Sequence, residues 1–432
     1  MGRWLALSLA TLVASQSGTL PVVPAADYLV SAFDRVPLVA FSEPRHGAAG
    51  TRAFLGSVIR HPRFAGRVND VVVEFGNARY QDIADRYVAG EPVSRDALRQ
   101  IWENTTVVTG VWTAPMYAGF LDDVRALNRG VPPARQVRVV LGDPPIDWSV
   151  VRGPADEDMN DWRDAHFAWI VEEQVLKRKR RALLWIGGAH VSRHVLFPDS
   201  LIHLLDQRVP GQTVVALSVD RSDVDPDVLD RLGPWPSLAA TPLRGTWLGR
   251  LSSGAVGWRL STATVEQNAD VAVFWEYPPR GQDEAPRIDP ASAAGVELRR
   301  RQQLAEATTP FRGAKIRFAA ASALLTPESE PALSAVLAEL QQDRGLRLLV
   351  KAFADAGEPS GLQLSFERAR RVVDWLATRG VSRARLEPRG CGDSRALWFG
   401  HTQMERAANR RAELVRLSKW ADCEPPASFD FR

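Results

Sequence analysis

Apolar residues occur in short continuous runs over the first 280 residues of the chain. Six runs are rich in Val, Leu or Ile and alternate little with polar residues: 36–42, 70–75, 136–142, 181–187, 213–219 and 270–275. Such runs are typical of strands that are buried on both faces. Helical stretches lie between them, including 51–60, 79–88, 95–103, 115–127 and 160–176. The alternation predicts an α/β fold, with a mostly parallel sheet covered by helices.

A second alternation of strands and helices begins after residue 311. A strand at 315–318 precedes a helix in which Leu333, Val336, Leu337 and Leu340 share one face, as helical spacing requires. A strand at 346–353, a helix that ends before Gly380, and strands at 385–388 and 411–417 follow. We therefore expect a smaller C-terminal α/β domain.

The region between the two patterns is typical of a linker. Residues 278–290 contain four prolines and no apolar period, and a helical stretch with three consecutive arginines follows. The last residues also lack an apolar period, as chain tails do. A chain of 432 residues is long enough for two domains. We divide it into an N-terminal domain, a linker with a helix, a C-terminal domain and a tail, at 27–278, 279–311, 312–418 and 419–432.

The first residues have the pattern of an export signal. Arg3 precedes an apolar run at 4–13, and small residues follow at 13–15. A second possible cleavage point follows Ala26, so we place the signal peptide at 1–26. The apolar run is too short to span a bilayer. A frayed N-terminal helix is the alternative interpretation.

The two cysteines, Cys391 and Cys423, bear on the same question of location. In an exported protein they could form one disulfide that closes the last part of the C-terminal domain. Two buried free thiols are the alternative.

The composition is that of a globular protein, with 45% hydrophobic and 24% charged residues and a net charge of +3. The charge is uneven, because residues 291–418 hold 21 Lys and Arg against 14 Asp and Glu. A basic C-terminal third suits an anionic polymer, although a solvated Arg-rich surface explains it equally well. No nucleic-acid-binding motif accompanies the excess, so we do not expect nucleic acid as a partner.

Three short motifs follow one another in the C-terminal domain. They are an acidic residue after a strand, Asp355, then Leu-Ser-x-x-Arg-Ala at 364–369, and Asn-Arg-Arg at 409–411. In this order they resemble the OmpA-like peptidoglycan-binding domain, over roughly 105 residues from about 312 to 418. The resemblance implies a location in the bacterial envelope, in the periplasm or at the outer membrane, and peptidoglycan as the partner.

The resemblance also implies a pocket for the diamino acid of the peptidoglycan stem peptide. Asp355 matches the family's ammonium-binding Asp, and Arg368 matches its carboxylate-binding Arg. An anion and a planar, bidentate cation suit a zwitterionic group. The sequence departs from the family pattern in two places: Ala352-Phe353-Ala354 stands for Gly-His-Thr, and Gly361 stands for an Asn. The Gly-x-Gly turn is kept at 390–392.

Polar residues follow four of the predicted strands in the N-terminal domain. Glu43 and His46 follow the first, Glu74 closes the second, Asp143 the third and His190 the fourth. Ligands bind at this edge of open α/β sheets, so the residues are candidates for one site. Each of them could instead be an ordinary strand-end cap, Asp143 above all.

The Glu-x-x-His, the Glu and the Gly-Ala-His at these strand ends resemble the superfamily of erythromycin-esterase-like hydrolases, ChaN-like haem-uptake proteins and TIKI-type proteases. The resemblance covers about 250 residues and implies catalytic positions at Glu43, His46, Glu74 and His190. Because its members differ in chemistry, it implies the fold more directly than the reaction.

Two mechanisms fit these residue types. In one, His46 with Glu43 or Glu74 activates water for attack on an ester or amide carbonyl, and Arg45 or His190 stabilises the oxyanion. In the other, the same Glu and His residues bind a divalent metal that lowers the pKa of water. Their spacing is not a tight metal signature, and the cofactor, a divalent metal or haem, stays open.

The sequence therefore predicts an exported, wall-bound envelope protein that carries a hydrolase-like domain. Its substrate, a small molecule or a peptide, is not identified by the residues, and neither is the oligomeric state. Two alternatives stay open. One is a non-catalytic envelope protein that binds haem or a metal, and the other is a purely structural wall anchor.

Overall fold

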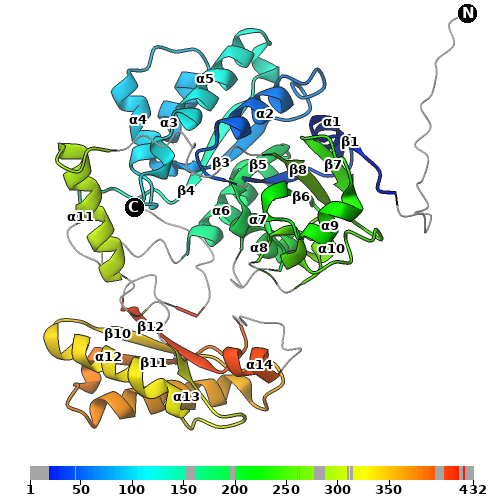
Figure 1. Ribbon diagram of the computed structural model, residues 1–432. Coiled ribbons are helices and arrows are strands. Elements are labelled where there is room, and N and C mark those ends of the chain that lie inside the picture. Colours follow the sequence, from blue (N-terminus) through cyan, green and yellow to red (C-terminus); the bar gives the residue numbers. More distant parts are fainter. Residues whose placement is uncertain are drawn as a thin grey trace, which may run out of the picture.

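A computed structural model describes most of the chain. It covers residues 19–43, 45–151, 162–194, 200–259, 261, 263–276, 288–308, 311, 315–394, 403–417 and 422–423. The predicted signal peptide up to residue 18, most of the linker and most of the tail lie outside the described residues. Figure 1 shows a large N-terminal α/β body and a smaller C-terminal one. Within the described residues, no helix has the length and apolarity needed to cross a membrane.

The N-terminal body is built on one eight-stranded sheet, in the order β1-β7-β8-β6-β2-β5-β3-β4. Six neighbouring strands of this order, from β8 to β4, pair in parallel, as the buried apolar runs predict. These strands are β2 (Leu38–Glu43), β3 (Asp70–Asn77), β4 (Arg138–Asp143), β5 (Ala182–Gly187), β6 (Thr213–Asp220) and β8 (Val271–Trp275).

Helices cover both faces of this sheet, which gives three layers (Figure 1). Successive strand residues point to opposite faces, so that Val71 and Val73 belong to one buried cluster and Val72 to the other. The first face carries α1 (Ala25–Ala32), α2 (Ala49–Ile59), α3 (Gln81–Val88), α4 (Arg95–Glu103) and α5 (Pro115–Arg129). The second carries α6 (Arg163–Val171), α7 (Gly188–Val191), α8 (Leu201–Arg208), α9 (Pro226–Leu232) and α10 (Val265–Asn268).

Two short antiparallel strands at one edge were not predicted. β7 (Ala239–Pro242) pairs with β8, and β1 (Val23–Pro24) pairs with β7. Neither is long enough to form an apolar run, so their pairing is set by the sheet they join. The backbone N–H of Ala25 also donates to the carbonyl of Leu238. A signal cleavage after Ala26 would remove β1 and the start of α1, whereas a cleavage near Ser15 leaves both in place.

The helix after the linker, α11 (Ala293–Thr308), packs on the N-terminal body. Arg300 donates to the carbonyls of Trp148 and Val151 at 3.3 and 3.2 Å, and Arg301 donates to the carbonyl of Glu103 at 2.9 Å. The predicted helix is therefore present, and its contacts extend the N-terminal body beyond residue 276.

The C-terminal body has a four-stranded sheet in the order β11-β10-β12-β9. Its elements are β9 (Ile316–Arg317), α12 (Glu330–Gln342), β10 (Leu348–Ala352), α13 (Gly361–Ala377), β11 (Leu386–Gly390), α14 (Gln403–Asn409) and β12 (Arg411–Arg416). The core lies between the sheet and helices α12 and α13. All four predicted strands and both predicted helices are present, and α14 was not predicted.

Cys391 and Cys423 form a disulfide across a sequence separation of 32 residues. Both sulfurs pack with Phe353, at the end of β10. The bridge therefore fastens Cys423 beside the loop that carries Asp355.

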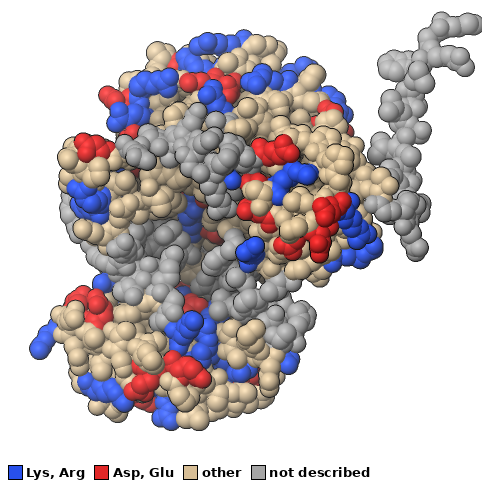
Figure 2. Space-filling view, in the orientation of Figure 1, with Lys and Arg blue, Asp and Glu red and all other residues tan. Residues whose placement is uncertain are grey.

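Charged residues do not form one basic band on the face shown in Figure 2, where Lys and Arg are interspersed with Asp and Glu over both bodies. Several arginines of the C-terminal body also have acidic neighbours, such as Arg389 with Glu387 and Asp422. On that face, the basic excess of the sequence is distributed rather than concentrated.

Candidate functional site

The four predicted catalytic positions lie in one cluster. They are Glu43, His46, Glu74 and His190. Glu43 ends β2, Glu74 lies in β3, and His190 lies in α7 directly after β5. Because β5 lies between β2 and β3, these strand ends are neighbours. A Cβ atom placed on Gly187, the last residue of β5, would lie 2.8 Å from Glu74 Oε2 and 2.9 Å from His46 Cε1. Only a glycine leaves room for the two side chains at this point.

Glu43 and His46 form the first pair of the cluster. Nδ1 of His46 lies 2.7 Å from Oε2 of Glu43, and the hydroxyl of Tyr117 donates to Oε1 of Glu43 at 3.1 Å. Glu43 is buried, whereas the side chain of His46 is 37% exposed. A buried carboxylate therefore orients an imidazole ring that is itself partly exposed.

The two groups influence each other's protonation. Burial raises the pKa of Glu43. Burial would lower the pKa of His46, but the hydrogen bond and the charge of Glu43 outweigh it and raise the pKa. The imidazole is thereby a stronger base than a histidine in water.

Arg163, which the sequence did not single out, holds the second part of the cluster together. Its Nη1 donates to Glu74 at 2.9 Å, and its Nε donates to Asp143 at 2.8 Å. All three side chains are buried. Thr106 also donates to Asp143 through its N–H and its hydroxyl. Asp143 thus has a structural role at the end of β4, where it accepts hydrogen bonds from Thr106 and Arg163.

Glu74 carries its charge because of these neighbours. Burial would raise the pKa of Glu74, but the charges of Arg163 and His190 outweigh it and hold the pKa well below its usual range. The N–H of Gly187 also donates to Glu74 Oε2 at 2.6 Å.

His190 is fixed from two sides. Its Nδ1 lies 2.8 Å from both carboxylate oxygens of Asp164, and its Nε2 lies 3.3 Å from Glu74 Oε1. Burial would lower the pKa of His190, but Asp164 and Glu74 outweigh it and raise the pKa to about 10. A doubly protonated ring donates to both carboxylates, so the contact of Nε2 with Arg163 Nη1 at 3.3 Å is then a close approach of two cations. Asp164 is a second residue that sequence reasoning missed. Its position beside Arg163 at the start of the predicted helix was the available signal.

This arrangement does not fit a metal ion. Across the described ranges, no three His, Cys, Asp or Glu side chains are gathered as a metal site requires. Arg163 already neutralises Glu74 and Asp143, the carboxylates that a cation would need. We therefore derive no step through a metal at Glu43, His46, Glu74 or His190.

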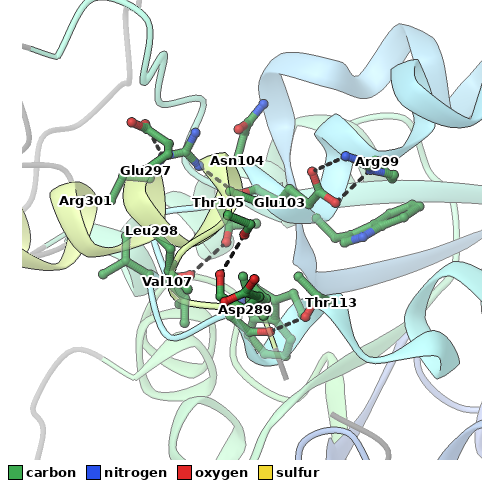
Figure 3. Close-up of a pocket in the computed structure, with 17 residues that line it drawn as sticks. Arg99, Glu103, Asn104, Thr105, Val107, Thr113, Asp289, Glu297, Leu298 and Arg301 are labelled. Carbon is green, nitrogen blue, oxygen red and sulfur yellow. Dashed lines mark hydrogen bonds and ion pairs between the residues drawn. The ribbon is translucent and has the colours of Figure 1, made fainter. Parts of the chain in front are cut away.

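A cavity of about 640 Å³ lies next to this cluster, between α4, the segment 104–113 and α11 (Figure 3). Trp112 lines it and also packs edge-on against His46, with 4.7 Å between the ring centroids. Leu298 and Arg301 of α11 also line it. His46 itself does not line this cavity, so the lining residues would supply no histidine to a haem bound there.

The three C-terminal motifs meet around the end of β10. Asn409, from the third motif, donates to Oδ1 of Asp355 at 2.9 Å. Ser365, from the second, accepts the N–H of Gly392 at 2.9 Å. A Cβ atom on Gly390 would clash with the backbone of α13, which explains the first glycine of the Gly-x-Gly turn, and Gly392 has a positive φ of 57°. The order of the motifs along the chain therefore becomes one contact network in the fold.

Asp355 and Arg368 occupy different environments in this network. Asp355 is 5% exposed and its Oδ2 accepts the N–H of Gly357 at 3.3 Å. Arg368 is fully buried, and all five of its N–H groups have partners. They donate to the carbonyls of Ser322, Phe353 and Ala319 and to both carboxylate oxygens of Glu358. Glu358 is a residue that the sequence did not indicate, and it takes the place expected for a ligand carboxylate.

Comparison with known proteins identifies the class of the C-terminal domain. Residues 317–415 match the model of the OmpA family, so the C-terminal domain is an OmpA family domain. The chain is 31% identical over 134 residues to the peptidoglycan-binding protein ArfA of Mycobacterium tuberculosis and of Mycobacterium bovis. That similarity covers 31% of this chain, and the chain spans only 39% of those relatives.

Two solved structures are each similar to about a quarter of the chain. The peptidoglycan-associated lipoprotein from Burkholderia pseudomallei is 25% identical, over 25% of this chain and 93% of that one, with a TM-score of 0.24. The cell wall anchor of the T6SS from Pseudomonas aeruginosa is 28% identical, over 24% of this chain and 76% of that one, with a TM-score of 0.21.

Proposed function

We propose that this chain is an envelope protein that binds peptidoglycan through its OmpA family domain. Asp355 binds the ammonium group of the stem-peptide diamino acid. One observation carries the proposal: Asn409 and the N–H of Gly357 hold the carboxylate of Asp355 in place at the point where the three motifs meet. Neutral donors fix the position of a carboxylate without pairing it with a cation, so a cationic ligand can form that pair. The relatives named for peptidoglycan binding support the same assignment.

Cosedimentation with purified peptidoglycan tests this function. The full chain is expected to pellet with the polymer, and Asp355→Ala is expected to stay in the supernatant. Asp374→Ala is the matched control, because Asp374 pairs with Arg383 on the surface of the same domain. If Asp355→Ala pellets as fully as the control, Asp355 does not bind the wall.

A second function, hydrolysis by the N-terminal domain, is favoured by the Glu43–His46 pair. Nε2 of His46 takes a proton from water, and the water oxygen attacks an ester or amide carbonyl. Glu43 stabilises the imidazolium that forms. The proton then passes to the leaving oxygen or nitrogen as the carbonyl bond to it breaks.

The oxyanion that forms in this reaction needs donors nearby. Nη2 of Arg163 is buried and has no hydrogen-bond partner among the described residues. Together with the cationic ring of His190, it offers positive charge to a developing oxyanion. Glu74 positions both groups.

Screening ester, amide and peptide substrates tests this second function. His46→Ala and Glu74→Ala are expected to lose turnover of any substrate that the parent chain accepts, by about 10²–10⁴-fold for the base. His203→Ala is the control, because the His203 ring lies next to Gln207 within α8 and takes no part in the Glu43–His46 or Glu74–His190 contacts. Turnover that persists in both variants would leave a wall anchor without this active site. Bound haem or metal without turnover would favour the ligand-binding alternative.

A further inference from the structure

The carboxylate of Glu358 lies in a pocket of four donors. Both oxygens accept from Arg368, at 2.6 and 2.7 Å. The N–H of Ala321 donates to Oε1 at 2.7 Å and the N–H of Asp355 to Oε2 at 2.9 Å. The side chain of Glu358 is 7% exposed. A bidentate guanidinium with two backbone N–H groups is a complete binding site for one carboxylate.

This carboxylate site adjoins the proposed ammonium site. Asp355 contributes its side chain to one and its backbone N–H to the other. The two sites together would suit an ammonium and a carboxylate on the same carbon atom. One half, however, is filled by the chain itself.

The turn between the two residues explains why Glu358 reaches the pocket. The N–H of Glu358 donates to the carbonyl of Asp355 at 2.9 Å, which folds residues 355–358 back on themselves. A group tethered by so short a turn has a high effective concentration at the site, so a ligand carboxylate competes poorly with it.

We propose that Glu358 is a built-in occupant of the carboxylate half of the pocket, and that this chain therefore recognises the stem-peptide ammonium alone. The inference rests on the proposed binding of peptidoglycan at Asp355. It makes Glu358 the residue that sets specificity. Stem peptides with lysine and with diaminopimelate differ by one carboxylate beside the ammonium, so the chain should bind the two alike.

The test compares two synthetic stem tripeptides, one ending in lysine and one in meso-diaminopimelate, by calorimetry on the full chain. The parent chain is expected to bind both with similar affinity. Glu358→Ala empties the carboxylate half and is expected to prefer the diaminopimelate peptide by about tenfold or more, as a charged hydrogen-bonded pair provides. Adding Arg368→Ala should remove that preference.

Glu358→Ala leaves Arg368 buried without its counter-charge and should therefore be less stable than the parent. A second measurement uses this loss of stability as its readout. Melting is recorded in sodium acetate and in sodium chloride of equal ionic strength. Acetate should raise the melting temperature of Glu358→Ala, whose carboxylate half is empty, but not that of the parent. A variant that folds only in acetate gives the same support.

The outcomes separate the inference from the function beneath it. If acetate stabilises Glu358→Ala but no chain binds either tripeptide, the peptidoglycan assignment fails and the self-occupied carboxylate site stands. A parent chain that already prefers diaminopimelate tenfold overturns the inference. A Glu358→Ala chain that responds neither to acetate nor to the extra carboxylate also overturns it.

Discussion

Nδ1 of His46 lies 2.7 Å from the carboxylate of Glu43, a residue that is only 4% exposed. The hydrogen bond and the charge of Glu43 overcome the effect of burial and raise the pKa of His46. As the pH falls, the imidazole therefore becomes protonated at a pH above the usual 6.5, and it then no longer acts as the proposed base. In Glu43→Gln the protonation midpoint of the His46 imidazole should move to lower pH. An NMR titration of the His46 ring measures both midpoints without a substrate, and equal midpoints would contradict the coupling.

Among the buried charged residues of the N-terminal domain, Arg163 is expected to cost the most stability when it is removed. Arg163→Met leaves Asp143 buried without its counter-charge and leaves Glu74 with His190 alone, so the free energy of unfolding should fall by about 3–5 kcal/mol. Urea denaturation measures the change. Arg95→Met is the control, because Arg95 pairs with Asp122 on the surface and should cost less than about 1 kcal/mol. Equal losses in the two variants would show that Arg163 does not carry this role.

His190 should make the stability of the fold depend on pH. Its pKa rises from 6.5 to about 10 on folding, because Asp164 and Glu74 outweigh burial. A raised pKa gives a contribution that is complete below pH 6.5 and is lost as the pH rises toward 10. Unfolding measured between these limits should show the decline in the parent chain and a flatter curve in His190→Gln. The same slope in both chains would assign the decline to other groups.

The disulfide should stabilise the C-terminal domain. Cys391 and Cys423 are 32 residues apart, and a loop of that length corresponds to about 3–4 kcal/mol of unfolding free energy. Calorimetry of the full chain with and without reductant should show a lower melting temperature for the C-terminal transition only. The double variant Cys391→Ser with Cys423→Ser should melt at the reduced temperature and ignore the reductant. A transition that reductant leaves unchanged would show that the bridge adds no stability.

Most of the fold could be predicted from the sequence because its strands are buried on both faces. Runs such as Val71–Val73 have no other stable environment in a soluble domain. β1 and β7 were missed because two to four residues carry no period, and α14 because its short helix has no apolar face that stands out.

The candidate sites were predicted in part, for a similar reason. Strand ends converge by topology, so Glu43, Glu74 and His190 could be placed together from their positions. Arg163 and Glu358 could not, because what they do depends on which buried charge they meet in space. Arg163 lies in a helix and Glu358 in a loop, and neither position in the sequence shows which charged residue the side chain will contact.

The binding isotherm of the full chain on purified peptidoglycan tests the central claim most directly, with Asp355→Asn as the comparison. The substitution keeps the size of the side chain and removes its charge. If Asp355 holds the stem-peptide ammonium, the variant should bind about ten- to a hundredfold more weakly, as the loss of a charged hydrogen bond requires. Isotherms that coincide would contradict the account, because the wall would then be held elsewhere on the chain or not by this pocket.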